Sequence, residues 1–137
     1  MEQLNLPLLG SDYEKLEFEL EVIEDRIKGL DSYIYVGKRF NNILNYPTDK
    51  TEFIFSFDIL EVIIISFKKE HSDFYELTRL VGIQLICIPK IIEYKHVKFC
   101  KFITDNNEIL ILQKDSNLYL IISNPKYSDE VLLSLLW

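Results

Sequence analysis

Residues 61–67 read EVIIISF, in which four consecutive β-branched aliphatic residues precede a serine and a phenylalanine. Side chains along a strand point alternately to its two faces, so a run with no polar alternation predicts a strand buried on both faces. The apolar part, Val62 to Phe67, is far too short to span a bilayer. These residues therefore indicate an interior strand of a sheet.

The second half of the chain contains a meander, in which strands alternate with short turns. Residues 90–104 predict one long strand or two, Asp105-Asn106-Asn107 predicts a turn, and residues 108–112 predict the returning strand of a hairpin. A second turn over 114–117 leads into a strand over 118–123. Further strands are predicted over 33–36, 52–57, 61–67 and 83–88, with a loop over 40–50.

Three helices complete the expected fold. The first follows a capping box, Ser11 to Glu14, and carries an apolar stripe that ends beside Gly29: Leu16, Leu20, Ile23, Ile27 and Leu30. A short middle helix is expected from Ser72-Asp73 to Leu80 or Val81, closed by Gly82, and a C-terminal helix begins at Ser128. The predicted class is α+β, a single mixed or mainly antiparallel sheet with an N-terminal helix, a short middle helix and a C-terminal helix.

The first element also has a second interpretation. Glutamates at 17, 19 and 21 alternate with apolar residues, which is typical of a strand: Leu16, Phe18, Leu20 and Val22. The capping box and the longer helical periodicity favour the helix. On that helix an acidic ridge is expected beside the apolar stripe, with Phe18 and Val22 outside the stripe: Glu14, Glu17, Glu21 and Glu24.

Composition and charge limit the function classes. The 137 residues are 48% hydrophobic and 27% charged, which predicts one globular domain over residues 1–137. The first 31 residues hold nine acidic and three basic side chains, a net charge of −6, while the whole chain carries −7. This balance argues against nucleic acid and anionic membranes as partners, and it favours a basic protein.

Chemical motifs are few. The two histidines, His71 and His96, lack zinc-site spacing, and four isolated glycines exclude G-x-G-x-x-G and the P-loop. We therefore expect no metal, no cofactor and no catalytic set. Residues 1–10 lack the basic start of a signal peptide, so a cytoplasmic protein with reduced thiols is expected, and a Cys87–Cys100 disulfide is the alternative.

Residues 93–95, Glu-Tyr-Lys, place a carboxylate and an ammonium on one face of a strand. With Asp58 they resemble the metal-dependent nucleases in which an acidic residue precedes an E-x-K motif. That resemblance implies that carboxylates hold Mg²⁺ and that the lysine positions water, in a cryptic site made of Asp58, Glu93 and Lys95. The simpler interpretation is an exposed strand whose lysines protect a sheet edge.

A small acidic protein without catalytic motifs is suited to neutralise a basic partner. We expect a non-enzymatic bacterial inhibitor of the immunity or antitoxin type, bound to a basic toxin domain such as a nuclease. The expected contacts are acidic residues of the first helix with two aromatic anchors: Glu14, Glu17, Glu21, Glu24, Asp25, Tyr13 and Phe18. The alternatives are an adaptor or subunit of another complex, including a phage-encoded inhibitor, and the cryptic nuclease.

Overall fold

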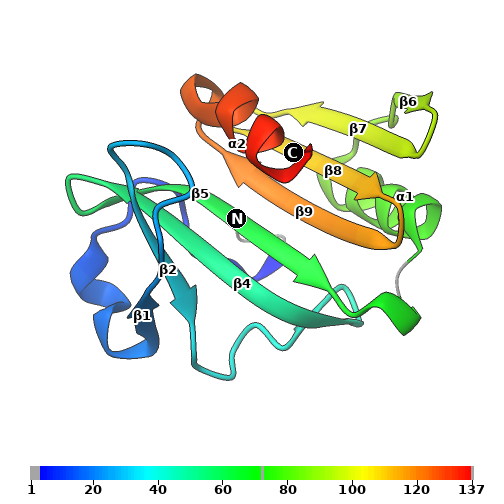
Figure 1. Cartoon of the computed structure of the whole chain (residues 1–137). Coiled ribbons are helices and arrows are strands. Elements are labelled where there is room, and N and C mark those ends of the chain that lie inside the picture. Colours follow the sequence, from blue (N-terminus) through cyan, green and yellow to red (C-terminus); the bar gives the residue numbers. More distant parts are fainter. Residues whose placement is uncertain (1–3, 72, 137) are drawn as a thin grey trace.

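The computed structural model describes residues 4–71 and 73–136, apart from the side chain of His71. These residues form a sheet of nine strands: β1 (Leu20–Val22), β2 (Asp31–Tyr35), β3 (Asn42–Ile43), β4 (Tyr46–Ser56), β5 (Ile59–Phe67), β6 (Ile91–Tyr94), β7 (Val97–Ile103), β8 (Glu108–Lys114) and β9 (Asn117–Ser123). The order is β1-β2-β4-β5-β9-β8-β7-β6, β3 pairs with the start of β4, and every pairing is antiparallel (Figure 1).

The interior strand and the meander are confirmed. Val62 to Ile65 of β5 are at most 1% exposed, and their strand lies between β4 and β9. The predicted strand over 90–104 is two strands, β6 and β7, which continue through β8 and β9 as an antiparallel meander. The mainly antiparallel α+β class therefore holds.

Two α-helices cover opposite faces of this sheet (Figure 1). Helix α1 (Phe74–Leu85) packs its buried side chains into the larger apolar cluster, which also contains Phe53, Ile63 and Ile111. Helix α2 (Ser128–Leu136) contributes Val131 to a second cluster on the other face. The predicted C-terminal helix is confirmed, although Asn124 caps the turn that precedes it.

The predicted N-terminal helix is wrong. Ser11 does not cap it, because its hydroxyl donates to the carbonyl of Leu8. The backbone of residues 10–13 is instead tied to the β4–β5 hairpin by hydrogen bonds that include Tyr13 N–H to the carbonyl of Asp58 (2.7 Å). The expected apolar stripe is divided, since Leu16 joins the α1 face and Ile27 and Leu30 join the α2 face.

The segment instead crosses from one face of the sheet to the other around the edge at β1. It forms two short 3₁₀ turns, η2 (Tyr13–Lys15) and η3 (Glu17–Glu19), before it pairs as β1 with β2. The alternating interpretation was therefore correct for residues 20–22.

The middle helix, which was expected to end at Leu80 or Val81, continues past Gly82 to Leu85. Asp73 caps its start by accepting a hydrogen bond from the N–H of Glu76, while Ser72 lies outside the described residues. Gly82 lies inside the helix, where a Cβ atom would be 2.9 Å from the carbonyl oxygen of Cys87. Glycine therefore lets the returning chain approach the helix, and the predicted strand over 83–88 does not form.

The loop expected over 40–50 is mostly strand. Strands β3 and β4 meet in a hairpin whose turn residues, Leu44 and Asn45, both have positive φ. Strand β4 then continues from Tyr46 through residues 48–50, so it is longer than the expected 52–57. The asparagines and proline of this stretch therefore belong to the β3–β4 hairpin and the start of β4 rather than to an open loop.

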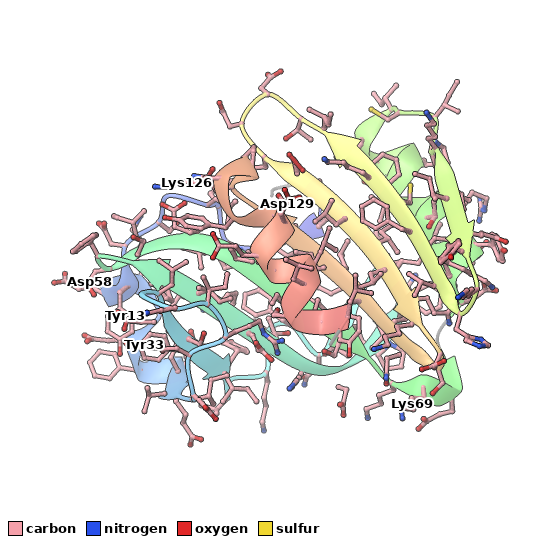
Figure 2. The ribbon with its side chains drawn as sticks, turned by 45° about the horizontal axis from the view of Figure 1, so that its top comes forward. Tyr13, Tyr33, Asp58, Lys69, Lys126 and Asp129 are labelled. Carbon is pink, nitrogen blue, oxygen red and sulfur yellow. The ribbon has the colours of Figure 1, made fainter. Side chains whose placement is uncertain are left out.

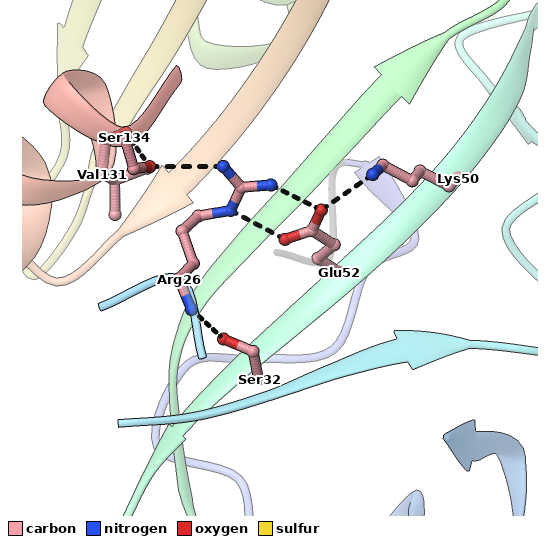
Figure 3. Close-up of polar contacts among 6 residues, drawn as sticks. All are labelled: Arg26, Ser32, Lys50, Glu52, Val131 and Ser134. Atoms are coloured by element: carbon pink, nitrogen blue, oxygen red, sulfur yellow. Dashed lines mark hydrogen bonds and ion pairs between the residues drawn. The ribbon is translucent and has the colours of Figure 1, made fainter. Parts of the chain in front are cut away.

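A buried ion pair joins the crossing segment to the sheet (Figure 3). Glu52 of β4 is 1% exposed, and its carboxylate accepts two hydrogen bonds from Arg26, at 2.9 and 2.7 Å. Lys50 lies 3.2 Å from the same carboxylate. Arg26 also donates to the hydroxyl of Ser134 in α2 (3.3 Å), and its backbone N–H donates to the hydroxyl of Ser32 in β2 (3.0 Å). Arg26 therefore links β4 and α2 through its guanidinium, and β2 through its backbone N–H.

Removing the cation should be costly. We expect Arg26→Ala to lower the free energy of unfolding by about 2–3 kcal/mol, because Glu52 remains buried with only Lys50 beside it. The double variant Arg26→Met/Glu52→Leu should recover most of that loss. Urea denaturation followed by circular dichroism measures both, and Arg79→Ala, which breaks the exposed Arg79–Glu76 pair, is the control expected to change stability little. An Arg26→Ala protein as stable as the control would contradict this account.

The same pair predicts a pH dependence. Burial raises the pKa of the Glu52 carboxyl, but Arg26 and Lys50 outweigh burial, so the folded pKa lies below its ordinary value. Such a carboxyl stabilises the fold above its unfolded pKa of about 4.3 and loses this contribution as the pH falls through the folded pKa. Between about pH 5 and about pH 2 the wild type should therefore lose stability more steeply than Arg26→Met/Glu52→Leu. Parallel pH profiles in urea denaturation would disprove the contribution of Glu52.

Candidate functional site

The structure separates the five expected acidic contact residues into two groups. Glu14, Glu17 and Glu21 are exposed on η2, η3 and β1, and within the described residues none of the three forms an ion pair. Glu24 and Asp25 follow the end of β1 and line a shallow hollow with Arg26, Glu52 and Ser134. No single helix flank carries them, so the predicted acidic ridge is wrong in shape.

Tyr13 supports this surface rather than projecting from it. Its ring packs against Tyr33 (5.1 Å between centroids) and Phe55 (5.4 Å), and Figure 2 places Tyr13, Tyr33 and Asp58 at the same end of the molecule. Burial raises the pKa of the Tyr33 hydroxyl, and Tyr13, Asp31 and Asp58 raise it further. The carboxylates of Asp31 and Asp58 therefore lie close enough to act on the Tyr33 hydroxyl.

Three apolar side chains project among these acids. Phe18 is 94% exposed, Val22 is 75% exposed and Phe57 is 96% exposed. Phe57 and Asp58 form the two-residue turn between β4 and β5, and both have positive φ (48° and 65°). We call the surface the acidic end, defined by Glu14, Glu17, Phe18, Glu21, Val22, Phe57 and Asp58.

Sequence reasoning found Phe18 but missed Phe57. Two-residue hairpin turns with positive φ normally contain asparagine, aspartate or glycine, because a bulky side chain is strained there. A phenylalanine that is both strained and exposed lowers stability without contributing to the core. The signal was available in the sequence as Phe57-Asp58 between two strand patterns, where a turn residue would be expected.

Glu19, in contrast, is satisfied internally. The hydroxyl of Tyr35 donates to its carboxylate (2.8 Å), and Arg39 forms an ion pair with it. The hydrogen bonds from Tyr35 and Arg39 lower the pKa of Glu19. Glu19 therefore fixes the chain before β1, between the exposed Glu17 and Glu21.

A second exposed surface lies at the opposite edge of the sheet, where α1 ends and β6 begins (Figure 1). We call it the α1–β6 surface, defined by Ile83, Ile86, Ile88, Ile91, Ile92 and Tyr94. Ile86 and Ile88 are 94% and 96% exposed. Ile86 also adopts the left-handed conformation (φ 54°), where its N–H ends the helix by bonding to the carbonyls of Gly82 and Ile83. A β-branched residue is strained there.

The nuclease-like set is not assembled. Asp58 lies in the β4–β5 turn at the acidic end, whereas Glu93 lies on β6 at the other edge of the sheet and Lys95 in the turn after it. Glu93 accepts a hydrogen bond from the hydroxyl of Tyr75. Within residues 4–71 and 73–136, no group of three or more His, Cys, Asp or Glu side chains is arranged to hold a metal ion.

The remaining predictions concern thiols and membranes. Cys87 is exposed, Cys100 is buried, and both are free, so the alternative Cys87–Cys100 disulfide is not formed. Burial raises the pKa of the Cys100 thiol. No helix in the described parts of the chain is long and apolar enough to cross a membrane.

Compared with protein-family models, curated proteins and solved structures, the chain has no significant match.

The strain at Phe57 is directly testable. We expect Phe57→Asn to raise the free energy of unfolding by about 1 kcal/mol, because asparagine tolerates positive φ better than phenylalanine does. Phe57→Ala removes the same ring without relieving the backbone, so it is the matched control and should give little or no gain. Urea denaturation compares the two variants, and equal stabilities would show that the turn is not strained.

Proposed function

We propose that this protein is a non-enzymatic binding protein that neutralises a basic protein partner through its acidic end, in the manner of an immunity protein or antitoxin. A toxin domain with a basic active site, such as a nuclease, is the partner class that this chemistry suits. The acids would accelerate encounter with such a partner and cover its cationic groups.

One observation carries the proposal. Phe18, Val22 and Phe57 are exposed apolar side chains at the end of the molecule that also presents Glu14, Glu17 and Glu21, which form no ion pair with any described residue. Exposed aromatic side chains surrounded by charge are typical of interface anchors, since they contribute large contact area while the charges direct approach. The strain retained at Phe57 supports the same interpretation, because such strain collects at functional positions.

Charge reversal tests whether binding depends on the acidic end or only on the negative net charge of the whole protein. The variant Glu14→Lys/Glu17→Lys/Glu21→Lys should lose capture of a basic protein from lysate of the source cell, and with the purified partner its association rate should fall by about tenfold or more. The control Asp49→Lys/Asp105→Lys/Asp129→Lys makes the same change in net charge at exposed acids elsewhere, and it should retain capture. Surface plasmon resonance at low and high salt measures the rates. Equal losses in both variants would reject the acidic end as the binding surface.

An adaptor or subunit role is the second candidate, and the α1–β6 surface favours it. Contiguous exposed apolar patches on soluble proteins often mark interaction sites. The same capture experiment discriminates between the candidates. A partner that is retained at high salt, retained by the acidic-end variant and lost with Ile88→Lys would favour the adaptor, because an apolar interface depends little on ionic strength.

A further inference from the structure

Strand β1 is an open edge of the sheet. Its residues pair with β2 as Leu20↔Tyr35, Glu21↔Ile34 and Val22↔Tyr33, and hydrogen bonds on either side join Val36 N–H to Glu19 (2.8 Å) and Ile23 N–H to Ser32 (3.0 Å). Directly opposed residues of an antiparallel pair alternate between bonded and non-bonded pairs. Glu21 is therefore bonded to β2, while the backbone groups of Leu20 and Val22 point away from it.

Three of those outward groups are available. The N–H of Leu20 donates to the carbonyl of Glu17 and closes η3. Within the described residues, no hydrogen bond is formed by the carbonyl of Leu20 or by the N–H and carbonyl of Val22. This edge therefore offers one donor and two acceptors, in the spacing that an added antiparallel strand uses.

The side chains along the edge are divided by face. Leu20 and Val22 lie opposite Tyr35 and Tyr33 and share the α1 face, where Val22 is exposed. Glu21 points to the other face, and residues 12–25 contain seven acids against one lysine. An extended segment beside β1 would then place apolar residues on the α1 face and cationic residues on the face of Glu21.

We infer that the acidic end receives its partner by strand addition, and that an extended segment of the partner, in which Lys or Arg alternates with apolar residues, pairs antiparallel with β1. The inference rests on the proposed function and specifies how the partner binds. An apolar residue of the segment lies opposite Val22 and exchanges two backbone hydrogen bonds with it. The next apolar residue, two positions further along the segment, lies opposite Leu20 and donates its N–H to the carbonyl of Leu20. The cationic residues between them lie on the face of Glu21.

The test uses a capped peptide of alternating lysine and valine as the probe, with two backbone-methylated versions. Methylation at the valines removes the N–H groups that face β1, whereas methylation at the lysines removes only the outer ones and is the matched control. We expect the valine-methylated peptide to bind about tenfold to thirtyfold more weakly by isothermal titration calorimetry, and the lysine-methylated peptide to bind like the parent. In NMR hydrogen exchange the parent peptide should protect the Val22 amide.

A protein variant provides the reciprocal test. Val22→Pro removes the backbone N–H that points away from β2, at an edge position that tolerates proline. It should weaken the binding of the unmethylated peptide by a similar factor. Ile91→Pro makes the same change on the β6 edge and should not weaken it, and circular dichroism checks that both variants fold.

The outcomes separate the two proposals. If both methylated peptides bind as the parent does, with strong salt dependence, strand addition is overturned while the charge-based function stands. If the Val22 amide is protected without peptide in a concentration-dependent manner, a second copy of the chain occupies the edge and the inference also fails. Equal loss of capture by the two charge-reversal variants would reject the proposed function itself.

Discussion

Strand β5 has no polar face, and the rest of the structure follows from that constraint. Val62, Ile63, Ile64 and Ile65 send side chains to both sides of the sheet, and all four are buried. Each buried aliphatic side chain stabilises the fold only if neighbouring elements exclude water from it. The sheet therefore needs a cover on both faces, which α1 and α2 supply over one half and the N-terminal segment supplies over the other.

Covering both faces with one short segment requires the chain to pass around the edge of the sheet. Leu16 is buried on one face and Ile27 on the other, and β1 lies between them. The crossing places a cation, Arg26, beside the buried Glu52, whose cost of desolvation is offset by the bidentate pairing. It also leaves the intervening glutamates outside, because a three-residue strand at the edge has nothing to cover its outer side. The passage of the chain around the sheet edge thus explains both the fold of this segment and the exposure of its glutamates.

The two exposed surfaces differ in their chemistry. Within the described residues, the acidic end combines carboxylates that form no ion pair with isolated apolar side chains and an open strand edge. Under the proposed function, it recognises its partner by charge and by backbone geometry together. The α1–β6 surface is mainly apolar and includes a β-branched residue held in the left-handed conformation at Ile86. Both surfaces keep strained, exposed apolar residues where polar turn residues would be more stable. The proposed partner contacts would account for their retention.

Local patterns in the sequence determined the strands of the meander, the interior position of β5, the C-terminal helix and the concentration of acids near the N-terminus. These features depend on alternation, turn residues and charge, which are local properties of the chain. Only the tertiary structure decided the first element, because the stripe from Leu16 to Leu30 and the capping box favour a helix, whereas the alternation at 16–22 also fits a strand. Hydrogen bonds from residues 10–13 to the β4–β5 hairpin, distant in sequence, resolved that choice. These hydrogen bonds also hold the Phe57-Asp58 turn beside Tyr13. Other long-range contacts paired Arg26 with Glu52 and placed Glu93 on β6, far along the sheet from the Asp58 turn. No local pattern encodes such neighbours, since they arise only when strands far apart along the chain pair in one sheet.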